Sequence, residues 1–387
     1  MDNFVFANPT KIIFGKDTQS QLADEIRPYG NKVLLHYGGG SIKKSGLYDQ
    51  ITAQLKNNGI EYVELGGVQP NPRLGLVYKG IEMCRNEKVP FILAVGGGST
   101  IDSAKAIALG TANDCDVWDF FTGKKTPDKM LPLGVVLTIP AAGSESSDSA
   151  VITKEEGDYK RPCGGSVMYP RFAVLNPELT FTLPPYQTAC GAADIIAHVM
   201  ERYFTQTANT DLSDRMCESV LKTVINNTRI ALKKPDDYNA RAEIVWGGAI
   251  AHNNLLGMGR VGDWASHMIE HELSGIYDIA HGAGLAIVFP AWMQYVYRAN
   301  LPRFVQFAVR VWDVDFSFSQ PEQIALEGIA RMKCFFKEIG LPTSLSDAGI
   351  EASRIEEMAA KAVENGPLGN FVSLGKDDIV KLLQSVV

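Results

Sequence analysis

Three of the six histidines in this chain lie close together in the segment DWASHMIEHELSGIYDIAHGAG. His267 and His271 are four residues apart, so on a helix they share one face, and His281 follows them. Asp194 and His198 form a second pair with the same helical spacing. One carboxylate and several imidazoles on helical faces are ligand types that a divalent transition metal takes in proteins. The alternative is that these histidines cap or fill helices and never meet.

The composition indicates a soluble globular protein. With 387 residues the chain has room for about two domains, and its 45% hydrophobic and 21% charged content is ordinary for a globular protein. A net charge of -7 without a basic stripe argues against a nucleic-acid partner. The six cysteines form no C-x-x-C motif, which fits a reducing cytoplasm. No signal peptide and no apolar run of about 20 residues is visible, so we expect a cytoplasmic protein without a membrane partner.

In the first half, short apolar runs alternate with amphipathic stretches. Lys32–Tyr37 and Phe91–Val95 are such runs, and the pattern predicts a parallel sheet with helices on both faces. The glycine-rich runs Gly38–Ser41 and Gly96–Ser99 each have a strand before them and a helix after them. Ligands of such sheets bind at the carboxyl ends of the strands, where helix N-termini attract phosphate. Neither run is the G-x-G-x-x-G fingerprint and each could be only a tight turn, but two of them favour a dinucleotide.

Residues near these runs indicate which dinucleotide is bound. Asp102 can accept hydrogen bonds from a hydroxyl, although an acid in the first turn of a helix needs no ligand. No acid follows Lys32–Tyr37, where sites for an unmodified ribose commonly place one, and Lys43 and Lys44 come next. We therefore predict NADP(H) rather than NAD(H). The alternative is that both lysines are simply solvated.

The second half has a different periodicity. From about Thr180 onward apolar residues recur with a period of 3.6, which predicts an all-helical domain. The prolines in Leu183–Pro185 mark the boundary, so the predicted domains are residues 1–182 and 183–387. The metal pairs lie in the second domain and the glycine runs in the first. We expect a cleft between the domains, which is a common place for a site.

Four motifs together resemble the iron-containing (group III) alcohol dehydrogenases. They are GGGSTID at Gly96–Asp102, TIPAAGSES at Thr138–Ser146, DIIAH at Asp194–His198, and H-x-x-x-H-E-L with a later H-G at His267–Gly282. The resemblance covers essentially the full chain, and NADPH-dependent butanol dehydrogenases and aldehyde reductases are the most similar subgroup. It implies a dehydroquinate synthase-like fold, in which an α/β N-terminal Rossmann-like domain with a parallel sheet precedes an all-α C-terminal domain.

The resemblance also implies a ligand set for the metal, Fe2+ or Zn2+. The matching positions are Asp194, His198, His267 and His281, which leaves His271 outside the set. This differs from the pairing of His267 with His271 that spacing alone suggests. We predict that His267 and His271 serve catalysis, with His271 relaying a proton to the product alkoxide.

The cofactor positions follow from the same resemblance. Gly38 to Ser41 would lie near the adenosine phosphate, and NAD-preferring members carry Asp where this chain has Gly39. Two positions depart from the family pattern: Ala142 replaces a threonine, and Ser147 stands where close relatives have asparagine. The full set of predicted cofactor-binding residues is Gly38, Gly39, Gly40, Ser41, Asn71, Gly97, Gly98, Ser99, Asp102, Thr138, Ser147 and Lys160.

The predicted activity is NADP(H)-dependent, metal-dependent reduction of short- to medium-chain aldehydes, such as butanal, to primary alcohols. One alternative is an NAD-dependent polyol dehydrogenase of the glycerol type, and another is a non-catalytic nucleotide-binding protein. A dehydroquinate-synthase-like lyase would need more basic residues than Lys160 and Arg161. We expect a homodimer.

Overall fold

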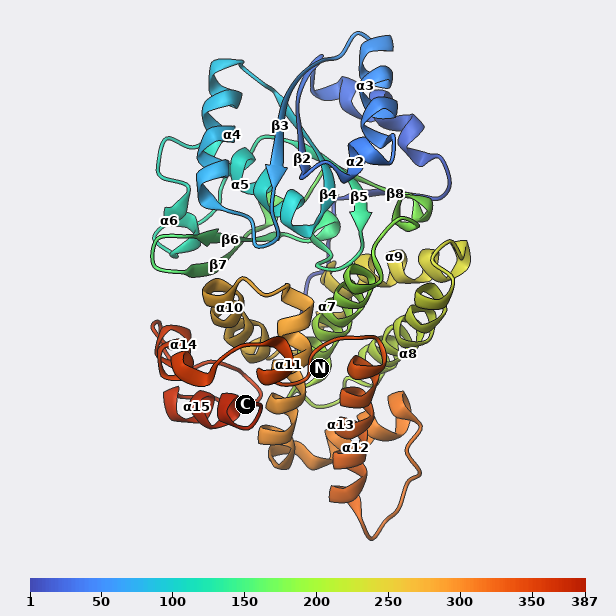
Figure 1. The fold of residues 1–387 in the computed structure, drawn as a ribbon, viewed down its shortest axis with the longest axis vertical. Coiled ribbons are helices and arrows are strands. Elements are labelled where there is room, and N and C mark those ends of the chain that lie inside the picture. The colour runs from blue at the N-terminus through green and yellow to red at the C-terminus, as the bar shows by residue number, and fades with distance from the viewer. The chain divides into compact units, whose positions relative to one another are not determined.

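The computed structural model describes all 387 residues, and these form two compact units (Figure 1). The sheet unit consists of residues 7–183 and 235–249. The helical unit consists of residues 1–6, 184–234 and 250–387. The sequence predicted one boundary, between residues 182 and 183. The structure in addition places residues 235–249 in the sheet unit and residues 1–6 in the helical unit.

The sheet unit is built on six parallel strands in the order β1-β8-β5-β4-β2-β3. Their bounds are Lys11–Phe14 for β1, Lys32–Gly38 for β2, Glu61–Val68 for β3, Phe91–Gly97 for β4, Leu133–Ile139 for β5 and Phe172–Leu175 for β8. The predicted parallel sheet is confirmed. An antiparallel hairpin, β6 (Ser149–Lys154) with β7 (Tyr159–Gly164), was not predicted.

Helices cover both faces of this sheet, as the continuous apolar strands require. The helices of the unit are α1 (Leu22–Ile26), α2 (Ser41–Lys44), α3 (Leu47–Asn57), α4 (Leu74–Asn86), α5 (Gly98–Ala112) and α6 (Trp118–Phe121). Alternate residues of β4 enter opposite cores. Ile92 packs in the core that contains residues of α4 and α5, and Leu93 in the core that contains residues of α1 and α3. Figure 1 shows α3 and α4 on opposite sides of the strands.

The two glycine-rich runs lie beside each other because β2 and β4 are neighbours. The chain leaves β2 toward β3 on one side and leaves β4 toward β5 on the other, so the strand order reverses between β2 and β4. Open α/β sheets bind their ligands at this kind of switch point, outside the carboxyl ends of the strands. Gly38 and Gly97 end the two strands there.

The helical unit contains no sheet, as the period of 3.6 predicted. Its helices are α7 (Pro185–Tyr203), α8 (Asp211–Lys233), α10 (Ala265–Tyr277), α11 (His281–Val296), α12 (Leu301–Trp312), α13 (Pro321–Glu338), α14 (Ile355–Ala362) and α15 (Lys376–Gln384), and α9 (Tyr238–His252) begins in the sheet unit. Proline in the first turn of α7 suits a helix start, where its missing N–H has no partner to lose. None of the helices is both long and apolar enough to cross a membrane.

Helix α7 packs against α8 and α11, and α10 packs against α11. The approach of α11 to α7 is so close that it requires a glycine: a Cβ on Gly282 would lie 2.6 Å from the carbonyl carbon of Cys190. Farther along, Phe204 stacks on Phe304 with ring centroids 4.6 Å apart, and Trp292 contacts both rings. This aromatic core joins the end of α7 to α11 and α12.

Candidate metal centre and cofactor-binding residues

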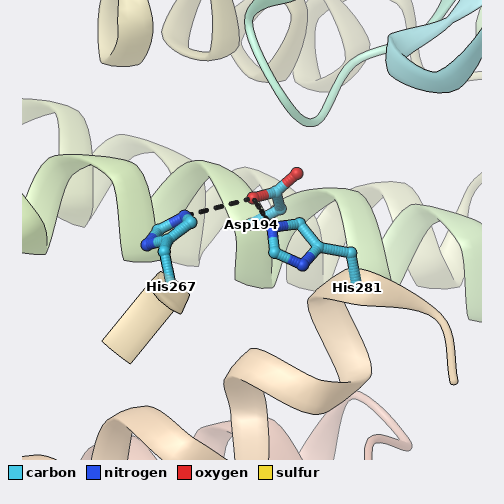
Figure 2. A group of neighbouring side chains, drawn as sticks. All are labelled: Asp194, His267 and His281. Carbon is cyan, nitrogen blue, oxygen red and sulfur yellow. Dashed lines mark ion pairs between the residues drawn. The ribbon is translucent and has the colours of Figure 1, made fainter. Parts of the chain in front are cut away.

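Three helices bring the four predicted metal ligands together. Helix α7 carries Asp194 and His198, α10 carries His267, and His281 is the first residue of α11. Asp194 Oδ1 lies 3.2 Å from His198 Nδ1, 3.7 Å from His281 Nε2 and 3.9 Å from His267 Nε2. Figure 2 shows Asp194 between His267 and His281, with both imidazoles turned toward its carboxylate.

These distances and the burial of the group fit a metal ion. Donor atoms placed tetrahedrally at 2.0–2.1 Å from a metal are roughly 3.4 Å from one another, close to the three separations from Asp194 Oδ1. Asp194 Oδ1, His198 Nδ1 and His267 Nε2 are buried and have no hydrogen-bond partner within the protein. Buried polar atoms without partners are rare because leaving them so costs free energy. A cation among these four side chains would give the unpartnered oxygen and nitrogen atoms a partner, so the residues fit a bound metal ion.

The charge balance of the cluster also favours a cation. Burial lowers the pKa of His198 well below its ordinary value, and the neighbouring imidazole of His252 lowers it further. His198 is therefore neutral and has a lone pair to donate. Burial also lowers the pKa of His267, but the carboxylates of Asp194 and Glu201 outweigh burial and raise the pKa to about 9. Two carboxylates thus draw positive charge to this place, and a divalent ion carries more of it than a proton.

Two buried carboxylates outside the predicted ligand set, Glu201 and Glu270, lie behind the ligands. Glu201 Oε1 accepts a hydrogen bond from His267 Nδ1 at 2.7 Å, and Glu270 Oε2 is hydrogen-bonded to His281 Nδ1. Metal-bound histidines usually donate their second nitrogen to a carboxylate or carbonyl in this way. The sequence did hold a signal for Glu201, which follows Asp194 by seven residues and His198 by three on one helical face.

His271 does not join the first group. Its ring nitrogen lies with Glu270 and His281 in a second set of donor atoms, all within 4.8 Å of one another. The ring of His271 is buried and its centroid is 5.6 Å from that of His281. No group of donor atoms within 4.8 Å of one another combines His271 with His267, and the group that contains His267 consists of Asp194, His267 and His281. His198 adjoins that group through Asp194 Oδ1, 3.2 Å from His198 Nδ1.

The first glycine-rich run leaves open space where the adenosine end of a cofactor is expected. A Cβ on Gly39 would meet no atom within 4 Å, and Gly40 has a φ of 117°, a left-handed conformation that favours glycine. Ser41 begins α2, and Lys43 lies on the same short helix. The ammonium of Lys43 is 3.7 Å from Glu64 Oε2 and 4.5 Å from the ring centre of Tyr48. Glu64 therefore offsets part of the charge that favoured a 2′-phosphate.

The second run packs too tightly for side chains. A Cβ on Gly97 would lie 2.8 Å from Ile139 Cβ, and one on Gly98 would lie 2.8 Å from Ala142 Cβ. Ala142 thus packs against the start of α5, where the family pattern has a threonine. The glycines leave the N–H groups of Gly98 and Ser99 bare at the start of a 15-residue helix, the kind of site that binds phosphate.

Asp102 and Ser147, both predicted to contact cofactor, already have protein partners. Asp102 accepts a hydrogen bond from Ser144 Oγ at 2.6 Å and another from Val151 N–H at 2.9 Å, which ties α5 to the following segments. Lys105 Nζ, fully buried, donates to the carbonyl oxygen of Ser147 at 2.8 Å and to its Oγ at 3.3 Å. Any contact of these side chains with a cofactor would be added to a structural role.

The remaining predicted cofactor residues, Thr138, Lys160 and Asn71, also belong to the sheet unit. Thr138 lies near the end of β5, and its exposed fraction is only 9%. Lys160 on β7 donates from Nζ to Asn71 Oδ1 at 3.0 Å, and both residues are buried. Asn71 has a φ of 53°, a left-handed conformation that asparagine tolerates better than most residues. Asn71 and Lys160 thus form one polar pair, and the structure brings these two predicted residues together.

A parallel sheet with a glycine-rich switch point, together with a helical unit that carries one aspartate and three histidines close together, is the arrangement expected of a protein that binds a dinucleotide and a metal ion. Comparison with known families agrees with the geometry. The sequence profile of "Iron-containing alcohol dehydrogenase" matches residues 9–177, and "Fe-containing alcohol dehydrogenase family, C-terminal" matches residues 188–387. The chain belongs to the iron-containing alcohol dehydrogenase family. This family implies a metal and a nicotinamide cofactor.

Three similar proteins cover this chain almost completely. The "Probable NADH-dependent butanol dehydrogenase 2" of Bacillus subtilis is 47% identical over 100% of both chains. The "NADPH-dependent aldehyde reductase YqhD" of Escherichia coli is 39% identical over 95% of this chain and 94% of its own. The crystal structure of NADH-dependent butanol dehydrogenase A from Thermotoga maritima has a TM-score of 0.97 and 43% identity, covering 100% of this chain and 99% of that one. The predicted family and fold class are therefore confirmed.

Proposed function

We propose that this alcohol dehydrogenase reduces short- to medium-chain aldehydes, such as butanal, to primary alcohols with NADPH and one divalent metal, Fe2+ or Zn2+. The observation that carries the proposal is the cluster of donor atoms around the buried Asp194 Oδ1, with partners at 3.2, 3.7 and 3.9 Å. Imidazole and carboxylate suit both Fe2+ and Zn2+, so the ligand types do not choose between these ions. The names of similar butanol dehydrogenases and aldehyde reductases support the substrate class.

Each part of the proposed reaction has residues that would serve it. When bound, the metal supplies a Lewis acid for the aldehyde oxygen and the reduced nicotinamide supplies the hydride. Asp194, His198, His267 and His281 would hold the metal. In the sheet unit, the bare N–H groups at Gly98 would bind the cofactor phosphates. His271 is the proposed group that passes a proton to the product oxygen.

The preference for NADPH rests on Gly39. No carboxylate directly follows β2, and open space surrounds the Cα of Gly39, so a 2′-phosphate would meet neither repulsion nor a side chain. Glu64 is a counterargument because its carboxylate lies 3.7 Å from the ammonium of Lys43. The names of the relatives also divide between NADH and NADPH. Comparison of kcat/KM for the two cofactors therefore decides this part of the proposal.

The test of the activity is a reduction assay with butanal on protein loaded with Fe2+ or with Zn2+, followed through the absorbance of the reduced cofactor. We expect turnover with NADPH that exceeds turnover with NADH and that stops when a chelator removes the metal. Oxidation of glycerol with NAD in place of butanal reduction would favour the polyol dehydrogenase. Cofactor binding without any turnover would favour a non-catalytic nucleotide-binding protein. The proposed homodimer is tested separately by light scattering.

A further inference from the structure

Glu201 is a fully buried carboxylate whose oxygens serve two different purposes. Its Oε2 accepts a hydrogen bond from the backbone N–H of Trp264 at 2.6 Å. Its Oε1 accepts from the backbone N–H of His267 at 3.1 Å and from His267 Nδ1 at 2.7 Å. One side chain of α7 thus holds both the beginning of α10 and the imidazole that α10 contributes to the metal cluster.

The first role of Glu201, which lies on α7, is to cap the N-terminus of a different helix, α10. The first N–H groups of an α-helix have no partner within the helix, and side chains at the N-cap normally accept from them. Trp264 occupies the N-cap of α10, with a φ of 71° and no side-chain hydrogen bond to the helix. Glu201 supplies the missing acceptor, and its negative charge suits the positive end of the helix dipole.

The second role concerns the tautomer of His267. When Nδ1 donates to Glu201, the proton of a neutral imidazole is on Nδ1 and the lone pair is on Nε2. His267 Nε2 is buried, has no hydrogen-bond partner and lies 3.9 Å from Asp194 Oδ1. When a metal replaces the second proton of the ring, the lone pair of His267 Nε2 therefore points at the position where that metal would bind. A carboxylate in this outer position also makes the imidazole a stronger ligand.

We propose that Glu201 is a positioning residue that sets the metal affinity of the protein, because it fixes the start of α10 and the tautomer of His267 at once. The inference rests on the metal centre of the proposed function and extends it to a residue that binds no metal itself. Glu270 has a more limited role, because its hydrogen bond to His281 Nδ1 orients a single imidazole ring. Of these two carboxylates, Glu201 is the one that joins the helix carrying Asp194 to the helix carrying His267.

The positioning role of Glu201 can be tested by replacing it with glutamine, which has nearly the same shape. The glutamine side chain has one oxygen and one NH2 group, while Trp264 N–H and His267 Nδ1–H both need an acceptor. If the NH2 group faces His267, it favours a proton on Nε2 and blocks the ligand. If it faces Trp264, two donors oppose each other at the start of α10. Either orientation weakens metal binding, by about 10- to 100-fold for an outer-shell change of this kind.

Asp263 offers a matched control at the same helix end. It is also buried, and its Oδ2 accepts from Ala265 N–H at 3.2 Å, but its Oδ1 accepts from Asn370 and Phe371 rather than from a histidine. Asp263→Asn therefore disturbs the start of α10 without touching the ring of His267. We expect both Glu201→Gln and Asp263→Asn to lower the thermal stability of the metal-free protein. Only Glu201→Gln should change the metal affinity by more than about threefold.

The experiment measures Co2+ affinity by competition with a chromophoric chelator, together with the visible absorption spectrum of bound Co2+. We expect Glu201→Gln to bind Co2+ about 10- to 100-fold more weakly, with an altered spectrum. If that variant does not fold, Glu201→Asp keeps the charge but withdraws the carboxylate by one methylene, and it should also bind more weakly. Wild-type affinity in a folded Glu201 variant, or an equal loss in Asp263→Asn, would overturn the role of Glu201. A wild-type protein that binds no Co2+ would instead refute the metal centre itself.

Discussion

Substitution of Gly282 by alanine should separate two helices that carry metal ligands. Gly282 follows His281 at the start of α11, and its Cα faces the backbone of α7 at Cys190, one turn before Asp194. A Cβ at this position would lie 2.6 Å from the carbonyl carbon of Cys190, whereas ordinary contact begins at 3.4 Å. Backbone cannot rotate away as a side chain can, so the helices must part by at least about 0.8 Å, the difference between these two distances; the carbonyl oxygen of Cys190 would lie closer still.

That displacement is large for a metal site. Ligand distances in a working site lie within about 0.2 Å of their ideal values, so a shift of His281 several times larger removes or distorts one of four ligands. We expect the affinity for Zn2+ to fall by at least about 10- to 100-fold, which corresponds to about 1.4–2.8 kcal/mol. Overpacking between the helices should also lower the free energy of unfolding of the metal-free protein by about 1–3 kcal/mol.

The assay is a competition titration with Zn2+ and a chromophoric chelator, on variants whose folding is checked by circular dichroism. Gly75→Ala is the control, because a Cβ on Gly75 in α4 would meet no atom within 4 Å. It should keep wild-type Zn2+ affinity and gain about 0.5–1 kcal/mol of stability, as alanine does in place of glycine within a helix. A folded Gly282→Ala protein with wild-type Zn2+ affinity would refute the argument that this close approach positions His281.

Three further predictions concern the cofactor, the pH dependence and the proton. A Cβ on Gly39 would meet no atom within 4 Å, so Gly39→Asp meets no steric obstacle. The new carboxylate would repel a 2′-phosphate, and kcat/KM for NADPH relative to NADH should fall by about 10-fold or more. An unchanged ratio would place the 2′-phosphate elsewhere. Burial lowers the pKa of His36 from 6.5 to about 4. Between these two pH values the imidazole binds a proton in the unfolded chain but not in the folded protein. The free energy of unfolding therefore falls as the pH drops from 6.5 toward 4. Urea unfolding at pH 7 and pH 5 should show a loss of about 2 kcal/mol that is absent from His36→Asn; equal losses in both proteins would contradict it. His271→Ala should retain metal and cofactor, measured by metal analysis and cofactor titration, while turnover falls by about 100-fold or more; unchanged turnover across pH would exclude the relay.

Much of the fold could be predicted from periodicity. The apolar strands around residues 32–37 and 91–95 and the period of 3.6 in the second half are local signals, and the structure has the predicted sheet and helices there. The hairpin of β6 and β7 was missed because its residues lack a long apolar run. The inclusion of residues 235–249 in the sheet unit depends on packing between distant segments, which periodicity does not reveal.

The candidate site shows the same division between local and distant signals. The spacing of Asp194 and His198 on one helix is local, and the structure places their donor atoms 3.2 Å apart. Spacing also suggested that His267 and His271 act together, but the direction of each ring depends on its outer partner. Glu201 turns His267 toward Asp194, whereas the ring nitrogen of His271 lies near Glu270 and His281. Glu201 lies on α7 and His281 on α11, so the sequence of α10 alone cannot show these partners.

The most direct test of the metal centre is an anomalous difference map from crystals of the protein loaded with Zn2+. The arrangement of the four side chains predicts one peak per chain, about 2.0–2.2 Å from donor atoms of Asp194, His198, His267 and His281. The same peak should be absent from Asp194→Ala crystals prepared in the same way. A peak bound by other residues, or an undiminished peak in Asp194→Ala, would contradict the assignment of this cluster as the metal site.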